Sequence, residues 1–141
     1  KKPFSTELPA VTSDYFPTAL AAAGIPLPDD REYDGINLLP LIDGKMKKRK
    51  GIGFHCRGMD AWIEKKYKII RISSKKEQKN PWELYDLLKD PFEENNLAKK
   101  FPGVVEKMNQ EFSVWATSVQ ADEKKVLEKY HSSKTKTKKS K

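Results

Sequence analysis

His55 and Cys56, adjacent in the stretch FHCRGM, place a base beside a nucleophile. A cysteine attacks a substrate as its thiolate, which a neighbouring imidazole can generate. However, Ile52, Phe54 and Cys56 alternate with smaller or polar residues, and this period of two predicts a strand over residues 52–57. Adjacent side chains of a strand point to opposite faces. We therefore predict that His55 does not activate Cys56, and that Cys56 is a buried small thiol.

His55 and Arg57 fall on the same face of the predicted strand. Imidazolium and guanidinium groups both donate hydrogen bonds to anionic oxygens. Together with Lys65, Lys66 or Lys68 they would form an anion-binding edge. The alternative is that these charges simply cover the solvated face of a half-exposed sheet. We take His55 and Arg57 as the candidate substrate-binding residues.

The carboxylates do not follow a metal-binding pattern. Asp29, Asp30 and Asp34 lie in a loop rich in Pro and Gly, but without the alternating ligand spacing of a calcium loop. Asp14 follows Ser13 at a predicted helix start, where a carboxylate serves as a cap and favours the helix dipole. The chain also lacks a Gly-rich phosphate loop, a G-x-S-x-G elbow and an H-E-x-x-H motif. We assign no catalytic residue and no metal ligand.

An antiparallel sheet is predicted to position these side chains. Strand-like runs occur at 52–57, 61–64, 67–72 and 82–87, with polar connections between them. Apolar residues recur at three- and four-residue steps through Pro102–Gln120, which predicts a helix that covers the sheet. A short core-facing helix is predicted from Ser13 to Gly24. The expected fold class is α+β, with four antiparallel strands under a long C-terminal helix.

The net charge of +8 is concentrated in two basic runs, at residues 45–50 and 134–141. Each run carries five Lys or Arg, so without them the net charge would be 8 − 10 = −2. This uneven distribution argues against a nucleic-acid partner, which favours a continuous basic surface. We expect the first run to be an exposed linker and residues 121–141 to be a disordered Lys-rich tail, with the alternative that residues 121–130 extend the preceding helix. The single cysteine excludes an intrachain disulfide.

Three motifs resemble those of sulfatases. The first motif is a D-x-x-P-T…G-I helix followed by a D-G-x-x-L-x-P-L-L segment, which is similar to SDYFPTALAAAGIPLPDDREYDGINLLPLIDG. The second is an aromatic-Lys-Leu-Ile strand, which is similar to YKII. The third is E-L-Y-D-L-x-x-D-P-x-E-x-x-N-L-A, which is similar to ELYDLLKDPFEENNLA. The chain thus resembles the C-terminal portion of an arylsulfatase-type sulfatase, N-acetylgalactosamine-6-sulfatase-like, of the alkaline-phosphatase-like superfamily. The resemblance implies the end of the large α/β domain at 1–50 (one helix plus loop) and a C-terminal subdomain at 51–120, and the tail at 121–141 lies beyond the part that it covers.

The resemblance also implies an activity, the hydrolysis of sulfate esters of carbohydrates. The family uses calcium and a formylglycine made from a C/S-x-P-x-R motif. Cys56 is followed by Arg-Gly-Met and does not match that motif. We therefore expect calcium and formylglycine in an N-terminal catalytic domain outside this chain, in a periplasmic or secreted parent, and expect no activity and no membrane association from this chain alone. Two alternatives remain: a non-enzymatic basic module that binds nucleic acid or anionic glycan, and a related phosphonate or phosphodiester hydrolase.

Overall fold

The computed structural model describes residues 5–73 and 80–138. It contains a short 3₁₀ helix, three α-helices and four strands within that part of the chain. In chain order these are η1 Thr12–Asp14, α1 Tyr15–Ala22, α2 Leu39–Ile42, β1 Ile52–Cys56, β2 Met59–Glu64, β3 Tyr67–Ile72, β4 Glu83–Asp86 and α3 Pro102–Lys138.

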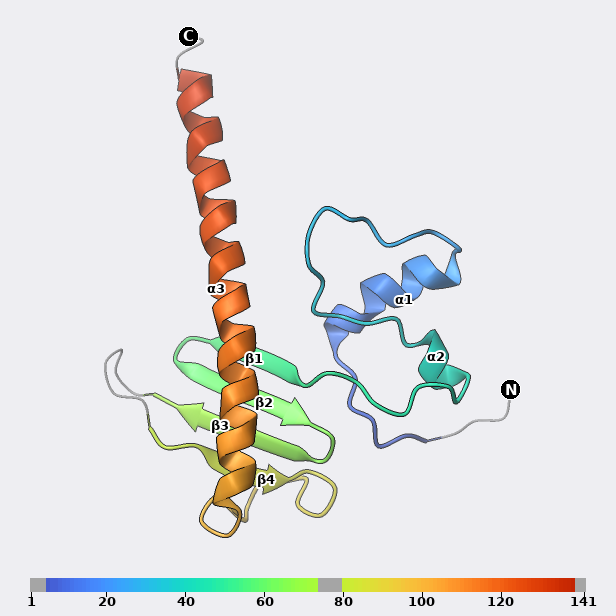
Figure 1. The fold of residues 1–141 in the computed structure, drawn as a ribbon, viewed down its shortest axis with the longest axis vertical. Helices are drawn as coiled ribbons and strands as arrows, with labels where there is room; N and C mark the ends of the chain where they lie inside the picture. Colours follow the sequence, from blue (N-terminus) through green and yellow to red (C-terminus); the bar gives the residue numbers. More distant parts are fainter. Residues whose placement is uncertain (1–4, 74–79, 139–141) are drawn as a thin grey trace.

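The four strands form one antiparallel sheet in the order β1-β2-β3-β4 (Figure 1). Each strand pairs with the next in sequence, so that short turns suffice to connect β1 to β2 and β2 to β3. The register aligns His55 with Asp60 and Asp60 with Arg71. The predicted α+β fold, a four-stranded antiparallel sheet with a long C-terminal helix, is confirmed.

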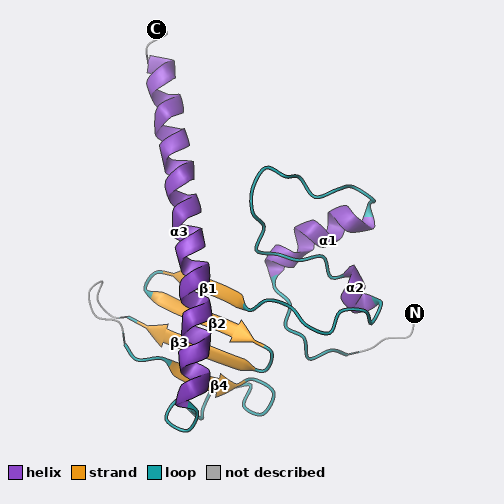
Figure 2. Cartoon of the chain, viewed as in Figure 1, coloured by secondary structure: helices purple, strands orange, loops and turns teal. Residues whose placement is uncertain are grey.

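The hydrophobic core lies between the sheet and α3, which crosses one face of the sheet (Figure 2). Trp62, Ile69 and Leu84 project from the sheet toward Met108 and Phe112 of the helix, and all five are buried. Burial of one such side chain contributes about 1.5–3 kcal/mol. This core holds the strands in the register that positions the residues discussed below.

Helix α3 is longer than predicted, because it continues beyond Gln120 to Lys138. The expectation of a disordered tail over 121–141 is therefore wrong up to Lys138, and residues 139–141 lie outside the described part. No Gly or Pro follows Gly103, and Ala, Glu and Lys are strong helix formers. The last turns extend past the sheet into solvent, where Val126 and Leu127 are exposed (Figure 1).

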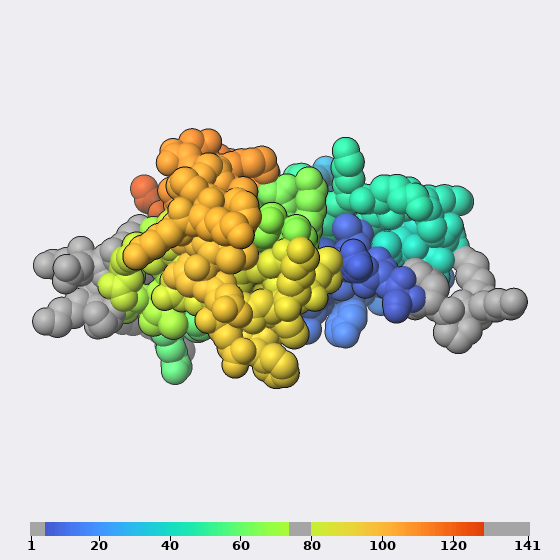
Figure 3. All heavy atoms as spheres, turned by 90° about the horizontal axis from the view of Figure 1, so that it is seen from below, coloured from blue at the N-terminus to red at the C-terminus, as the bar shows by residue number. Residues whose placement is uncertain are grey.

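Residues before β1 form an N-terminal block beside the sheet-and-helix body (Figure 3). Its central contact is an ion pair between Asp14 and Arg49, 2.7 Å apart, whose side chains are 0% and 4% exposed. Asp14 also accepts hydrogen bonds from the backbone N–H groups of Val11 and Ile36. Asp14 is thus more than the cap we expected, and Arg49 does not belong to an exposed linker as predicted.

Candidate functional site

His55, Asp60 and Arg71 lie side by side on three neighbouring strands. Asp60 pairs with His55 of β1 and with Arg71 of β3 in the antiparallel register. Residues directly opposite in such a register point to the same face of the sheet. This is the face that α3 covers, because Trp62 of the same strand, two residues after Asp60, packs against the helix.

Asp60 binds both neighbours through its two carboxylate oxygens. Its Oδ1 lies 2.6 Å from His55 Nδ1, and its Oδ2 accepts a hydrogen bond from Arg71 Nε at 2.8 Å and forms an ion pair with Arg71 Nη2 at 2.6 Å. Burial raises the pKa of Asp60, but the hydrogen bonds from His55 and Arg71 together outweigh burial and lower the pKa below its usual value. Asp60 is therefore a carboxylate at neutral pH, and an ionised carboxylate can only accept.

This ionisation state sets the tautomer of His55. Because Asp60 only accepts, His55 Nδ1 carries a proton and donates it to the carboxylate. The side chain of His55 is 57% exposed, whereas that of Asp60 is 10% exposed. In this tautomer the other ring nitrogen, Nε2, can accept a hydrogen bond from a ligand hydroxyl, and Asp60 fixes the ring orientation.

Arg71 anchors this arrangement from beneath the helix. Its guanidinium carbon lies 4.2 Å from the ring centroid of Trp82 and 5.7 Å from that of Phe112. Guanidinium groups stack favourably on aromatic faces, and Arg71 is only 12% exposed. Arg71 therefore holds Asp60 from the core side while Asp60 orients His55 toward solvent.

We predicted that Arg57 lies on the same strand as His55. This prediction is wrong, because β1 ends at Cys56. Arg57 and Gly58 both have positive φ, at 48° and 84°, and form the two-residue turn to β2. Such a turn is typical of β-hairpins, and Gly58 provides it at little cost. Arg57 and His55 still lie at the same end of the sheet, and both are exposed. Cys56 is also exposed, so the predicted buried thiol is wrong.

The three lysines lie elsewhere, so the predicted anion-binding edge does not form. Lys65 and Lys66 make the β2–β3 turn, at the end of the sheet opposite to Arg57. Lys66 pairs with Asp86 at 2.9 Å, and Lys68 pairs with Glu93 at 2.7 Å. In an antiparallel meander consecutive turns lie at opposite ends of the sheet, so the β2–β3 turn cannot lie beside His55.

The described residues do not fit the calcium and formylglycine of the sulfatase family. Within residues 5–73 and 80–138, no group of three or more His, Cys, Asp or Glu side chains could hold a metal ion. Cys56 lacks the flanking residues of the formylglycine motif. No reaction step through either group is therefore assigned to this chain.

Comparison with known proteins agrees with the sequence motifs, although no protein-family profile matches the chain. A stretch of 40 residues is 48% identical to human steryl-sulfatase, covering 28% of this chain and 7% of that protein. The chain is related to the sulfatases. The match is consistent with the C-terminal portion of such an enzyme, as the motifs predicted.

Solved structures extend the match beyond those 40 residues. A "6S-sulf" protein of Bacteroides thetaiotaomicron, from a locus for glycosaminoglycan metabolism, is 28% identical with a TM-score of 0.59 over 74% of this chain and 24% of its own. A protein solved with its substrate D-glucosamine-2-N,6-O-disulfate is 22% identical with a TM-score of 0.60, over 77% of this chain and 24% of its own, and supports the fold alone. The present chain thus spans about a quarter of the length of these two solved structures. No helix in its described part is long and apolar enough to cross a membrane.

Proposed function

We propose that this chain is the C-terminal region of an enzyme that hydrolyses sulfate esters of carbohydrates. The observation that carries the proposal is the 28% identity and shared fold over 74% of the chain with a protein from a glycosaminoglycan metabolism locus. The chain spans only 24% of that protein, so the proposal assigns the chemistry to residues outside the chain. Calcium and formylglycine belong to that N-terminal catalytic domain, and this chain alone is inactive.

The burial pattern supports a division of the chain near residue 50. The core cluster consists of Trp62 and later residues, and none of residues 5–51, the block before β1, belongs to it. That block instead exposes large apolar side chains: Tyr15 is 70%, Phe16 50% and Ile25 52% exposed. In the proposal these side chains pack against the catalytic domain, and residues 51–120 form the C-terminal subdomain. Apolar patches of this kind favour association with another surface.

His55 and Arg57 are proposed to bind the anionic substrate of the parent enzyme. Asp60 holds the exposed His55 ring through Nδ1, so the ring loses less entropy on binding a substrate than a free side chain would. Arg57 lies two residues away, in the adjoining turn. Both are substrate-binding residues in this proposal, with Asp60 as the positioning residue.

The first test is to sequence the coding region upstream of Lys1. The proposal predicts an open reading frame with a C/S-x-P-x-R motif, whose product, expressed with the formylglycine-generating machinery, releases sulfate from a sulfated sugar. An upstream frame that lacks both this motif and sulfatase activity would contradict it. The related phosphonate or phosphodiester hydrolase would then be tested with phosphate esters.

The second test concerns the site residues in that full-length enzyme. His55→Ala is expected to raise KM up to about tenfold with a smaller change in kcat, because the hydrogen bond that Nε2 accepts from a substrate hydroxyl is lost. Lys125→Ala, on the exposed part of α3, is the matched control and should leave KM unchanged. An unchanged KM in His55→Ala would remove His55 from the substrate site.

A further inference from the structure

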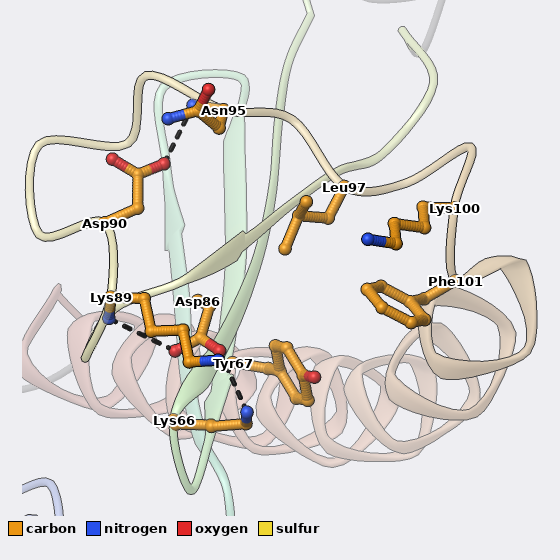
Figure 4. A pocket seen from close by; sticks show the side chains of 9 residues that line it. All are labelled: Lys66, Tyr67, Asp86, Lys89, Asp90, Asn95, Leu97, Lys100 and Phe101. Atoms are coloured by element: carbon orange, nitrogen blue, oxygen red, sulfur yellow. Dashed lines mark hydrogen bonds and ion pairs between the residues drawn. The ribbon is translucent and has the colours of Figure 1, made fainter.

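A hollow lies at the end of the sheet opposite to His55. It has a volume of about 420 Å³ and is formed by the β2–β3 turn, the end of β4 and the segment that leads into α3 (Figure 4). Three lysines line it from three different segments: Lys66, Lys89 and Lys100. Tyr67 and Phe101 supply aromatic rings to the same hollow.

The carboxylates of this hollow are already engaged. Asp86 is 5% exposed, pairs with Lys66 at 2.9 Å and accepts from the backbone N–H of Lys89. Asp90 accepts the backbone N–H groups of Glu94 and Asn95 at 3.1 and 2.8 Å, which closes the turn after β4. The hydrogen bond from Lys66 is the main cause that lowers the pKa of Asp86, and these backbone hydrogen bonds lower the pKa of Asp90.

Two ammonium groups therefore remain for a ligand. Among the residues that the structure describes, no carboxylate lies within 4.0 Å of the ammonium group of Lys89 or Lys100. The Lys100 ammonium lies 5.5 Å from the ring centroid of Phe101, a contact that leaves its hydrogen-bond donors free. Three lysines against two aspartates leave the lining with a net charge of +1.

The lining combines this positive charge with apolar area. Leu97 and Phe101 are half-buried and pack against the core, so the wall is supported from behind. Tyr67 projects from the first position of β3, and its ring lies 4.8 Å from the Lys66 ammonium. A bare inorganic anion would use only the lysines, whereas a ring that carries an anionic ester would also cover the apolar wall.

We infer that this hollow, which we call the lysine pocket, binds a sugar ring carrying a tetrahedral anionic ester. Lys89 and Lys100 bind the ester oxygens, and Phe101 packs against the ring. The site is separate from the group formed by His55, Asp60 and Arg71, which we call the His55 cluster, and ligand binding there needs no catalytic domain. The inference goes beyond the proposed activity, because a sulfatase and a non-enzymatic module would both be able to use such a pocket.

The test is a titration of the full 141-residue chain with D-glucosamine-2-N,6-O-disulfate, glucose 6-phosphate and inorganic sulfate, followed by calorimetry. Either sugar ester is expected to bind at least tenfold more tightly than inorganic sulfate, and the tighter of the two identifies the ester as sulfate or phosphate. Equal affinity for the sugar esters and inorganic sulfate would overturn the assignment of a sugar ring. No measurable binding of any of them would overturn the pocket.

A pair of double variants separates the pocket from general charge. Lys89→Ala/Lys100→Ala is expected to weaken binding of the sugar ester about tenfold or more, since two charge-assisted contacts are lost. Lys124→Ala/Lys125→Ala removes the same charge from the exposed part of α3. It should change the affinity for the sugar ester by no more than about twofold, because only a screened long-range attraction is lost. Equal weakening by both variants would overturn the inference. All four positions are exposed or surface-paired, so both proteins should fold, which melting curves check.

Discussion

Removal of the Asp60 carboxylate should be among the most destabilising single changes in the sheet. In Asp60→Ala the Arg71 guanidinium, 12% exposed, would lose its carboxylate and remain between the sheet and Trp82. Loss of one partner of a buried ion pair costs about 3–5 kcal/mol. Because Arg71 keeps its aromatic stacking, we expect the lower end, about 3 kcal/mol.

A double-mutant cycle isolates the interaction from the loss of each side chain. Arg71→Met removes the charge and keeps an apolar side chain over Trp82. The variant that lacks both charges should be about 2 kcal/mol more stable than the sum of the single effects predicts. The assay is urea unfolding followed by circular dichroism. With a slope of about 1–3 kcal/mol per molar urea, the midpoint of Asp60→Ala should fall by about 1–3 M.

His55→Ala is the internal control of this cycle. His55 is 57% exposed, so its hydrogen bond to Asp60 should contribute less than about 1 kcal/mol to stability. The reasoning would be refuted by Asp60→Ala costing no more than His55→Ala, or by strictly additive effects of the Asp60 and Arg71 substitutions. Either result would mean that Asp60 does not hold Arg71, and so does not connect His55 to the core.

Three further predictions follow from the packing and the ionised groups. Gly53→Ala should lower the free energy of unfolding in urea by about 1–3 kcal/mol, because the added Cβ would overlap the Trp115 ring. In the control Gly103→Ala no atom lies within 4 Å of the added Cβ, so the free energy of unfolding should be unchanged or slightly higher. Arg49→Leu should cost about 3 kcal/mol by leaving the buried Asp14 carboxylate without its partner, as measured by loss of protection of the Ile36 amide in hydrogen exchange. The pKa of Asp14 is below its usual 3.8 in the folded state, so its contribution to the free energy of unfolding is complete above about pH 4 and is lost as the pH falls through the folded pKa. A urea-unfolding series from pH 6 to 2 should show a decline in stability, and Asp14→Asn should make this decline shallower without abolishing it, because Asp60, Asp86 and Asp90 also have lowered pKa values.

The elements with strong periodicity were predictable from the sequence. The strand runs and the apolar stripe of α3 follow local rules, and the structure confirms a four-stranded sheet under a helix. The end of α3 does not follow from the sequence in the same way, because a low-complexity Lys-rich composition predicts a disordered tail, whereas helix propensity permits a continuous helix to Lys138.

The candidate site was only half predictable, for a different reason. His55 was identified from its residue type, but its partners Asp60 and Arg71 depend on the register of three strands. Register follows from turn geometry, and the Arg57–Gly58 turn was not recognised as a two-residue hairpin turn. With that turn in place, Asp60 would have been expected opposite His55. The Asp14–Arg49 pair joins residues 35 positions apart, and no local pattern in the sequence indicates it.

The His55 cluster and the lysine pocket are too far apart for one sugar residue to occupy both. Tyr67 lines the pocket and Arg71 anchors the cluster, and the two are four residues apart on β3, about 13 Å along a strand. A monosaccharide that binds the pocket therefore cannot touch His55, so His55→Ala should leave its affinity for the isolated chain unchanged. A longer sulfated chain has the length to reach both ends of the sheet. In the full-length enzyme, Lys89→Ala/Lys100→Ala should then raise KM for an oligosaccharide but not for a monosaccharide. An equal rise for both substrates would place the pocket within the catalytic site and contradict the separation that the strand imposes.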